Sequence, residues 1–339
     1  MAASQAQDDH DHVYAFIGLA PFLLKHMRVD YSQSVEKTFA AMMKALVREA
    51  KNVDTFGYLP ANADLSKSRL ILPSWVPNWT VRIARTPLLC YSNLFEASGR
   101  GYGVPWVDKC KHYDPPTSEW NELVIAGKVI DQVAYKLKPY SLYQVTSSLE
   151  VDPYHKTASL PWQMPTLQRF VDELMDLGFP NRSHVSLNAL LRTLFMDGVQ
   201  WGAISALTSG KPLYRTTPAV EGLPHHERIK DVITELVQSP DANLDELPHG
   251  ATPQLLHELC NVQYQRRVVV CEKGKFAMAP DCAEKGDKIC IIYGSRVPLV
   301  LRTRSDGNYT MVGECFYDGA MYGDMADPVD ENAVLFKVV

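Results

Sequence analysis

Hydrophobic and polar positions follow two different periods along this chain. Residues 35–47 carry an apolar stripe at helical spacing, and Ser32 or Ser34 can cap a helix there. Four further segments with the helical period lie in the middle of the chain, so we expect a helical lobe at about 164–264. From Arg266 the period changes to two, and the pattern predicts a series of short strands.

Glycine-containing turns separate these strands, at Lys273-Gly274, Lys285-Gly286 and Asp306-Gly307. The stretch ELVIAGKVIDQVAYKL, which begins at Glu122, also alternates and predicts a strand, a turn at Gly127 and a second strand. Short strands at this spacing favour a small barrel or curled sheet. The predicted fold class is therefore α+β, with a helical lobe packed on a small antiparallel β-barrel or curled sheet.

The predicted organisation is one folded unit with a loose beginning. The polar residues 1–12 are expected to be flexible, and residues 13–339 are expected to form a single unit. Within it, the helical lobe spans about 164–264, and the β lobe spans about 120–137 plus 266–320.

Composition restricts the function classes. Apolar residues make up 46% of the chain, the net charge is −5 and the pI is about 6.1, which argues against a nucleic-acid or anionic-membrane partner. No apolar run reaches the length of a membrane span, and no secretory signal is visible, so we expect an intracellular, cytoplasmic protein. The seven cysteines form no CxxC pair and are expected to be reduced, buried thiols. No ligand spacing suggests a metal or another cofactor, and we expect none.

The stretch RLILPSWVPNWT, residues 69–80, places two tryptophans on a stiff backbone. Trp75 and Trp79 follow Pro73 and Pro77 at matching offsets. Proline restricts its own φ and the conformation of the preceding residue, so the segment is expected to be rigid and extended. Two interpretations follow. In the simpler one, the two rings pack in the protein core; in the other, they form an aromatic wall of a ligand pocket.

Several segments resemble fungal heterokaryon-incompatibility (HET) proteins. LPSWVPNW resembles their LPSWVPDW signature, DHDHVYAFIGLA resembles their D-x-VYALLGLA segment, and VDYSQSVEKTFAAMMKALV resembles their DYSKSVEEVY helix. KGDKICIIYGSRVPLVLR and YTMVGECFYDGAMYGD resemble their C-terminal strands. The similarities run in order from about residue 8 to about residue 324, nearly the whole chain.

The departures from the HET pattern limit what the resemblance implies. The defining HET region of these proteins precedes the segment at which this chain starts, so we expect the cell-death activity of that region to be missing. Asn78 stands where the family usually has Asp, and Ser295 where it often has Cys. The resemblance implies a fold and carries over no catalytic residues.

Two functions from different classes fit these observations. The first is a cofactor-independent enzyme of a fungal secondary-metabolite pathway, which folds an apolar terpenoid- or polyketide-like substrate for an intramolecular [4+2] cycloaddition, as a Diels–Alderase does. Such a cyclase requires an apolar cavity and one or two hydrogen-bond donors. The alternative is a non-catalytic HET-like binding or regulatory protein that acts through protein–protein contacts.

The enzyme hypothesis specifies a set of site residues. Its candidate catalytic donors are Asn78, His112 and Tyr113. The aromatic residues expected to bind the apolar small-molecule substrate are Trp75, Trp79, Trp106 and Trp201. An enclosed apolar pocket with a few convergent donors would favour the enzyme, whereas a large exposed aromatic patch would favour the binding protein.

Overall fold

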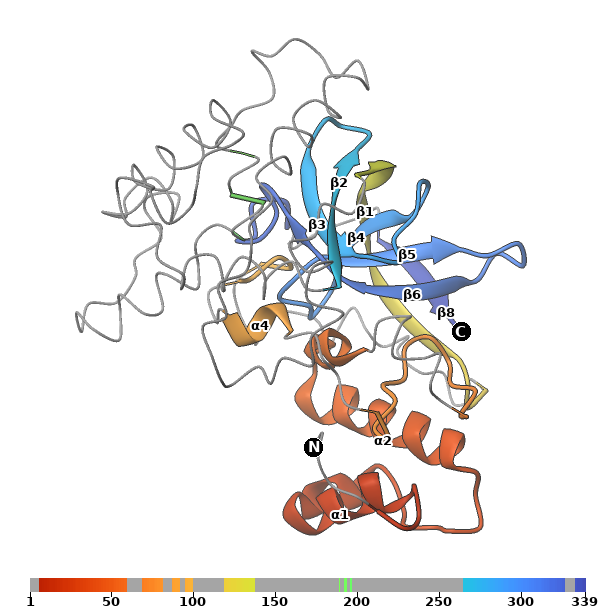
Figure 1. The fold of residues 1–339 in the computed structure, drawn as a ribbon. Coiled ribbons are helices and arrows are strands. Elements are labelled where there is room, and N and C mark those ends of the chain that lie inside the picture. Colours follow the sequence, from red (N-terminus) through yellow and green to blue (C-terminus); the bar gives the residue numbers. More distant parts are fainter. Residues whose placement is uncertain are drawn as a thin grey trace, which may run out of the picture.

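The fold is described from a computed structural model, shown as a ribbon in Figure 1. The predicted helical lobe at about 164–264 lies almost entirely outside the residues that the structure describes. The described residues are 6–59, 69–81, 87–91, 95–99, 119–137, 189, 192–193, 196, 265–326 and 333–339.

Helices α1 and α2 form layers beside the strands, and α2 lies between α1 and the sheet (Figure 1). The predicted helix is confirmed as α2, with Ser34 as its N-cap and a hydrogen bond from the Lys37 backbone amide to the Ser34 side chain. The short helix α4 spans Leu88–Tyr91. The helical elements at the start of the chain are α1 (Asp11–Leu19), the 3-10 turn η1 (Pro21–Lys25), α2 (Val35–Ala50) and the 3-10 turn η2 (Asp54–Tyr58).

The N-terminal segment is ordered earlier than its polar sequence suggests. Helix α1 begins inside the predicted flexible segment 1–12, and the preceding residue, His10, is buried. Polarity misleads at this point because the His10 ring is buried while both of its nitrogens lie within hydrogen-bond distance of oxygen atoms of Asp8 and Gln33.

Eight strands form one sheet in the order β4-β5-β6-β8-β1-β2-β3-β7. The structure is therefore mixed α/β, and the antiparallel pairing that the sequence predicts is confirmed for every neighbouring pair except the parallel contact of β6 with β8. The strands are β1 (Leu123–Lys136), β2 (Arg266–Cys271), β3 (Phe276–Pro280), β4 (Lys288–Ile292), β5 (Leu299–Thr303), β6 (Tyr309–Glu314), β7 (Phe316–Tyr317) and β8 (Val334–Val338).

Strand β1 corrects the prediction of a turn at Gly127. It runs unbroken for 14 residues and pairs successively with β8, β4 and β2, with register shifts near Val129 and Val133. Glycine is required at position 127 by a close approach between strands: a Cβ there would lie 2.9 Å from the Ile292 Cα. The absence of a side chain lets β4 cross β1 closely, which a turn would not require.

The strands β4, β5, β6, β8 and β1 are linked in a ring, because β1 also pairs with β4. The contact between β6 and β8 consists of one registered pair, Tyr309 with Val338, so the ring is not a clear barrel. Strand β8 lies beyond the β lobe that the sequence predicts.

Both faces of β4 are buried, in two separate apolar clusters. On β4, Cys290 and Ile292 belong to the larger cluster, which also contains residues of α1 and α2, whereas Ile289 and Ile291 belong to the smaller one. Alternation along a strand sends successive side chains to opposite faces. The near-continuous apolar sequence of β4 follows from this double burial.

Candidate functional site

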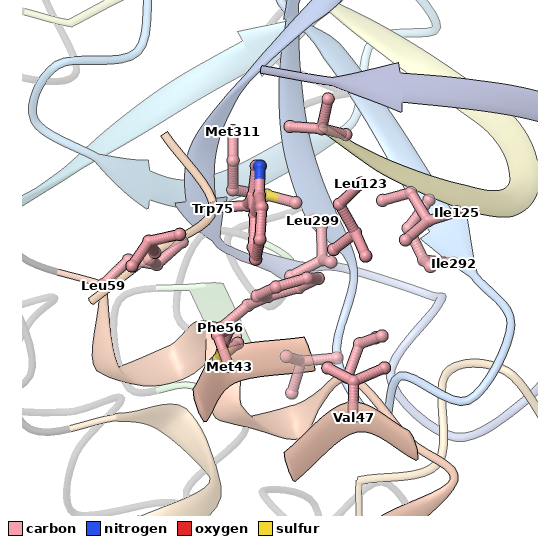
Figure 2. Packing of buried hydrophobic residues seen from close by; sticks show 14 of the residues in the cluster. Met43, Val47, Phe56, Leu59, Trp75, Leu123, Ile125, Ile292, Leu299 and Met311 are labelled. Carbon is pink, nitrogen blue, oxygen red and sulfur yellow. The ribbon is translucent and has the colours of Figure 1, made fainter. Parts of the chain in front are cut away.

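Trp75 is a core residue. Its side chain is 0% exposed, and its indole nitrogen donates a hydrogen bond of 3.2 Å to the backbone carbonyl of Asn121. Figure 2 shows the ring between Met311 and Phe56, at the junction of the strands and the helical layer. The nitrogen of Lys44 lies 5.7 Å from the ring centroid. The Trp75 ring is therefore packed in the core between the strands and the helical layer.

Trp79 and Asn78 are also held by local contacts. The Trp79 ring packs edge-on against Phe39 of α2, with centroids 5.0 Å apart. Asn78 is buried, and its side-chain oxygen accepts hydrogen bonds from the backbone amide of Thr80 (3.0 Å) and from the Thr80 hydroxyl (2.8 Å). This arrangement is an Asx turn, which fixes the chain after the second tryptophan.

Ser74 anchors the tryptophan segment to the sheet. Its hydroxyl donates to the backbone carbonyl of Val339 and accepts from the backbone amide of Met311, at 2.9 Å. The segment is thus joined both to β6 and to the residue that follows β8. Sequence reasoning missed this role, although a serine between Pro73 and Trp75 is the polar residue available to satisfy strand backbone groups there.

The remaining candidate site residues cannot be placed beside these. His112, Tyr113, Trp106 and Trp201 lie outside the described residues. The pocket that these side chains were predicted to form with Trp75, Trp79 and Asn78 stays a prediction.

A buried ion pair connects the sheet to the helical segments. Arg266 on β2 and Glu314 on β6 are both 0% exposed, and their nitrogen and oxygen are 2.8 Å apart. The same Glu314 oxygen accepts a hydrogen bond of 2.8 Å from the backbone amide of Leu88, at the start of α4. A Cβ at Gly57 in η2 would lie 2.8 Å from the other Glu314 oxygen, so η2 packs directly on the carboxylate.

A second buried carboxylate, Asp131, accepts hydrogen bonds from the Tyr317 hydroxyl (2.7 Å) and from the backbone amides of Gln132 (2.8 Å) and Lys273 (3.3 Å). Burial, together with the hydrogen bond to Asp131, raises the pKa of Tyr317 well above its ordinary value. The phenol therefore stays protonated, and this pair holds the end of β7 against β1. Sequence reasoning did not single out Asp131, although a single carboxylate within a mainly apolar strand indicates a buried group that needs hydrogen-bond donors.

Three of the described cysteines are buried thiols with raised pKa values. Cys271, Cys282, Cys290 and Cys315 are free of disulfides, and Cys282 is half-buried. Burial raises the pKa of Cys290 to about 12 and raises those of Cys271 and Cys315 above their ordinary value. A thiol reacts through its thiolate, so Cys271, Cys290 and Cys315 are poor nucleophiles.

Within the described ranges, no three His, Cys, Asp or Glu side chains gather so as to hold a metal ion. Among the helices in the same ranges, none is long and apolar enough to cross a bilayer. The buried carboxylates Glu314 and Asp131 thus join strands and helical segments within the described part of the chain.

Comparison with known proteins finds a similarity to one domain family in the C-terminal strands. Residues 247–336 match the family described as the Het-6 beta-barrel domain. This range contains β2 to β7 and most of β8, whereas β1 lies outside it.

A particular relative is the Neurospora crassa protein named "Heterokaryon incompatibility protein 6, OR allele". The chain is 32% identical to it over 70 residues, which cover 20% of this chain and 10% of that protein. The similarity therefore spans about a tenth of the length of the relative. No solved structure matches the chain.

Proposed function

We propose that this chain is a non-catalytic binding protein of the heterokaryon-incompatibility type, which acts by contacting another protein. The match of its strands to the Het-6 beta-barrel domain and the printed name of the Neurospora relative support the class. We also infer that the ring of five strands, completed by β1, is the counterpart of the barrel for which that domain is named.

The observation that carries the proposal is the exposed apolar segment at residues 19–31. It connects α1 through η1 to the start of α2, and Leu23 anchors it in the core while its neighbours point outward. Several large apolar side chains that are exposed along one short segment favour an interaction site there. The exposed side chains of this segment, which we call the apolar segment, are those of Leu19, Phe22, Leu24, Val29 and Tyr31.

Polar groups lie among the exposed apolar side chains of the segment, as they do in protein interfaces. Lys25 and His26 both contact the carboxylate of Glu49 on α2, at 2.5 and 3.0 Å. An apolar centre with a polar rim is the usual anatomy of a protein–protein contact. The segment follows and contains carboxylates at Asp8, Asp9, Asp11 and Asp30.

These carboxylates favour a protein over a lipid surface as the partner. Along residues 8–31 these four carboxylates outnumber the two cations Lys25 and Arg28, which weakens attraction to anionic headgroups, and the net charge of −5 acts in the same direction. The partner that fits is a protein with apolar side chains at its centre and basic groups at its edge.

The cyclisation reaction stays a prediction. Trp75 and Trp79 are engaged in packing and Asn78 in an Asx turn, and the other four candidate site residues lie outside the described part of the chain. The cytoplasmic location stays a prediction in the same way.

Two matched variants test the proposal. Leu19 is 82% exposed and Ile71, which lies outside the apolar segment, is 87% exposed, so a lysine at either position leaves the core untouched. Proximity labelling in fungal cells should recover the same partner with the wild type and with Ile71→Lys. Recovery should fall with Leu19→Lys, and the purified partner should bind that variant about tenfold or more weakly, as expected for an interface anchor.

Three results would contradict the proposal. The first is equal partner binding by Leu19→Lys and Ile71→Lys. The second is co-sedimentation of the wild type with phosphatidylserine vesicles, lost in Leu19→Lys, which would identify a membrane as the partner. The third is turnover of a terpenoid substrate by the purified chain, which would favour the cyclase.

A further inference from the structure

His10 occupies a buried position between two hydrogen-bond acceptors. Its Nδ1 lies 2.6 Å from a carboxylate oxygen of Asp8, and its Nε2 lies 3.0 Å from the backbone carbonyl oxygen of Gln33. Tyr14 and Tyr31 flank the ring, with centroids 5.9 and 5.5 Å away. The His10 residue is 7% exposed, so the ring is largely shielded from water, whereas its partners Asp8 and Gln33 are exposed residues.

The two partners require a particular protonation state. A carbonyl oxygen only accepts, and so does an ionised carboxylate, so both ring nitrogens must donate to make both bonds. Only the imidazolium form carries a proton on each nitrogen. In the neutral ring one nitrogen presents a lone pair to an oxygen, and that contact is lost.

We propose that His10 is a protonation-controlled latch, which in its charged form ties the residues before α1 to Gln33, the residue that precedes the N-cap of α2. The contact with Gln33 is the one that deprotonation breaks, because the shorter bond to the Asp8 carboxylate retains the remaining proton. The latch therefore controls how firmly the beginning of α1 is held to the chain that leads into α2.

The groups around His10 raise its pKa and so favour the charged form of the ring. Burial by itself lowers the pKa of His10, but the hydrogen bonds to Asp8 and Gln33, with the charges of Asp8 and Asp11, outweigh it and raise the pKa above its ordinary value. The charged groups that face the ring are the carboxylates of Asp8, Asp11 and Asp30.

The Tyr31 phenol does not titrate in the same range as His10, and Tyr14 is held by a separate hydrogen bond. Tyr31 donates a hydrogen bond of 2.6 Å to Asp11, which raises its pKa to about 12. Tyr14 donates to the backbone carbonyl of Asp30, at 2.9 Å. These two links persist when His10 loses its proton, so the opening is confined to the residues around His10.

The direction of the pH dependence follows from the raised pKa. A group whose pKa is higher in the folded than in the unfolded state contributes its full stabilisation of the fold at pH values below the unfolded-state pKa. This stabilisation is lost as the pH rises through the folded-state pKa. The latch is therefore closed in mildly acidic solution and opens as the pH rises past the His10 pKa.

The test is an NMR titration of the histidine ring signals of the full chain. His10 should titrate above the ordinary value of about 6.5, and Asp8→Asn should lower its pKa. His12→Gln is the matched control, two positions away on the same segment, and should leave the His10 titration in place. A His10 pKa at or below the ordinary value, or one that Asp8→Asn does not lower, would overturn the proposal.

Hydrogen exchange supplies the second readout. Protection of the first α1 amides, relative to those of α2, should fall by about 2- to 10-fold between about pH 5.5 and about pH 8, as expected for one lost hydrogen bond. His10→Gln should abolish this difference. An unchanged pH difference in His10→Gln, or none in the wild type, would show that His10 is not the latch. If His10→Gln fails to fold, the wild-type titration and the Asp8→Asn variant still decide the outcome.

Discussion

Replacement of Glu314 by glutamine should strongly destabilise the protein, although it preserves the shape of the side chain. The amide oxygen can still accept from the Leu88 amide, but it carries no charge to neutralise Arg266. Both side chains are 0% exposed, so the guanidinium would remain charged in the interior. Breaking a buried pair by removal of one partner costs about 3–5 kcal/mol.

Replacement of both partners should cost much less than removal of one. Arg266→Met with Glu314→Leu removes both charges together, and such apolar replacements of a buried pair are often neutral or stabilising. Gly57 packs against the Glu314 carboxylate, so the branched leucine side chain must fit the same space, which limits how much stability the double variant recovers. The double variant should therefore recover most of the stability that Glu314→Gln loses.

Urea unfolding, followed by circular dichroism, measures these differences in free energy. The matched control is the ion pair of Lys337 and Glu122, whose side chains are 44% and 22% exposed. Lys337→Gln should cost less than about 1 kcal/mol, because partly exposed pairs contribute little. If Glu314→Gln costs no more than Lys337→Gln, the reasoning about the buried pair is refuted.

Three further predictions concern the core and the thiols. Trp75→Ala should cost about 3–5 kcal/mol in unfolding experiments; an unchanged unfolding curve with lost activity would place the ring on a ligand instead. Gly127→Ala should destabilise clearly, since its Cβ would meet β4 at Ile292, and an unaltered melting temperature would contradict the close crossing. All seven cysteines should titrate as free thiols under denaturing, non-reducing conditions, and disulfide-linked peptides in mass spectrometry would disprove this.

The sequence predicts the regular elements where local pattern and tertiary burial agree. In α2 the apolar stripe and the Ser34 cap point to the same helix that the structure shows. In the C-terminal strands, Gly274, Gly286 and Gly307 all adopt positive φ angles at the turns expected for them. Such turn residues report their own backbone conformation, so they can be recognised without knowledge of the partner strand.

The errors occur where a residue serves a distant neighbour. A glycine inside an alternating pattern fits either a turn or a close approach, and only the position of β4 shows which one applies to Gly127. The early start of order at His10 depends on the carbonyl of Gln33, which the local sequence does not indicate. Arg266 and Glu314 lie far apart in the sequence, so their pairing requires the sheet topology.

The sequence predicts the candidate site only in part, because it does not show which side chains the fold buries. The sequence distinguishes two uses of Trp75 and Trp79, packing and ligand binding, and the contacts with Met311 and Phe39 show the packing. The exposure of the apolar segment could not be predicted, because Leu19 and Leu23 are alike in sequence and opposite in burial. Which leucine faces outward depends on how η1 turns after α1.

The central claim, that the protein acts through the apolar segment, is tested most directly by hydrogen exchange of the chain with and without its purified partner. Binding should protect the amides of residues 19–31 and leave those of β4 to β6 unchanged, since the strands are already buried on both faces. Protection confined to the strands or to residues 69–81, with none in 19–31, would contradict the account.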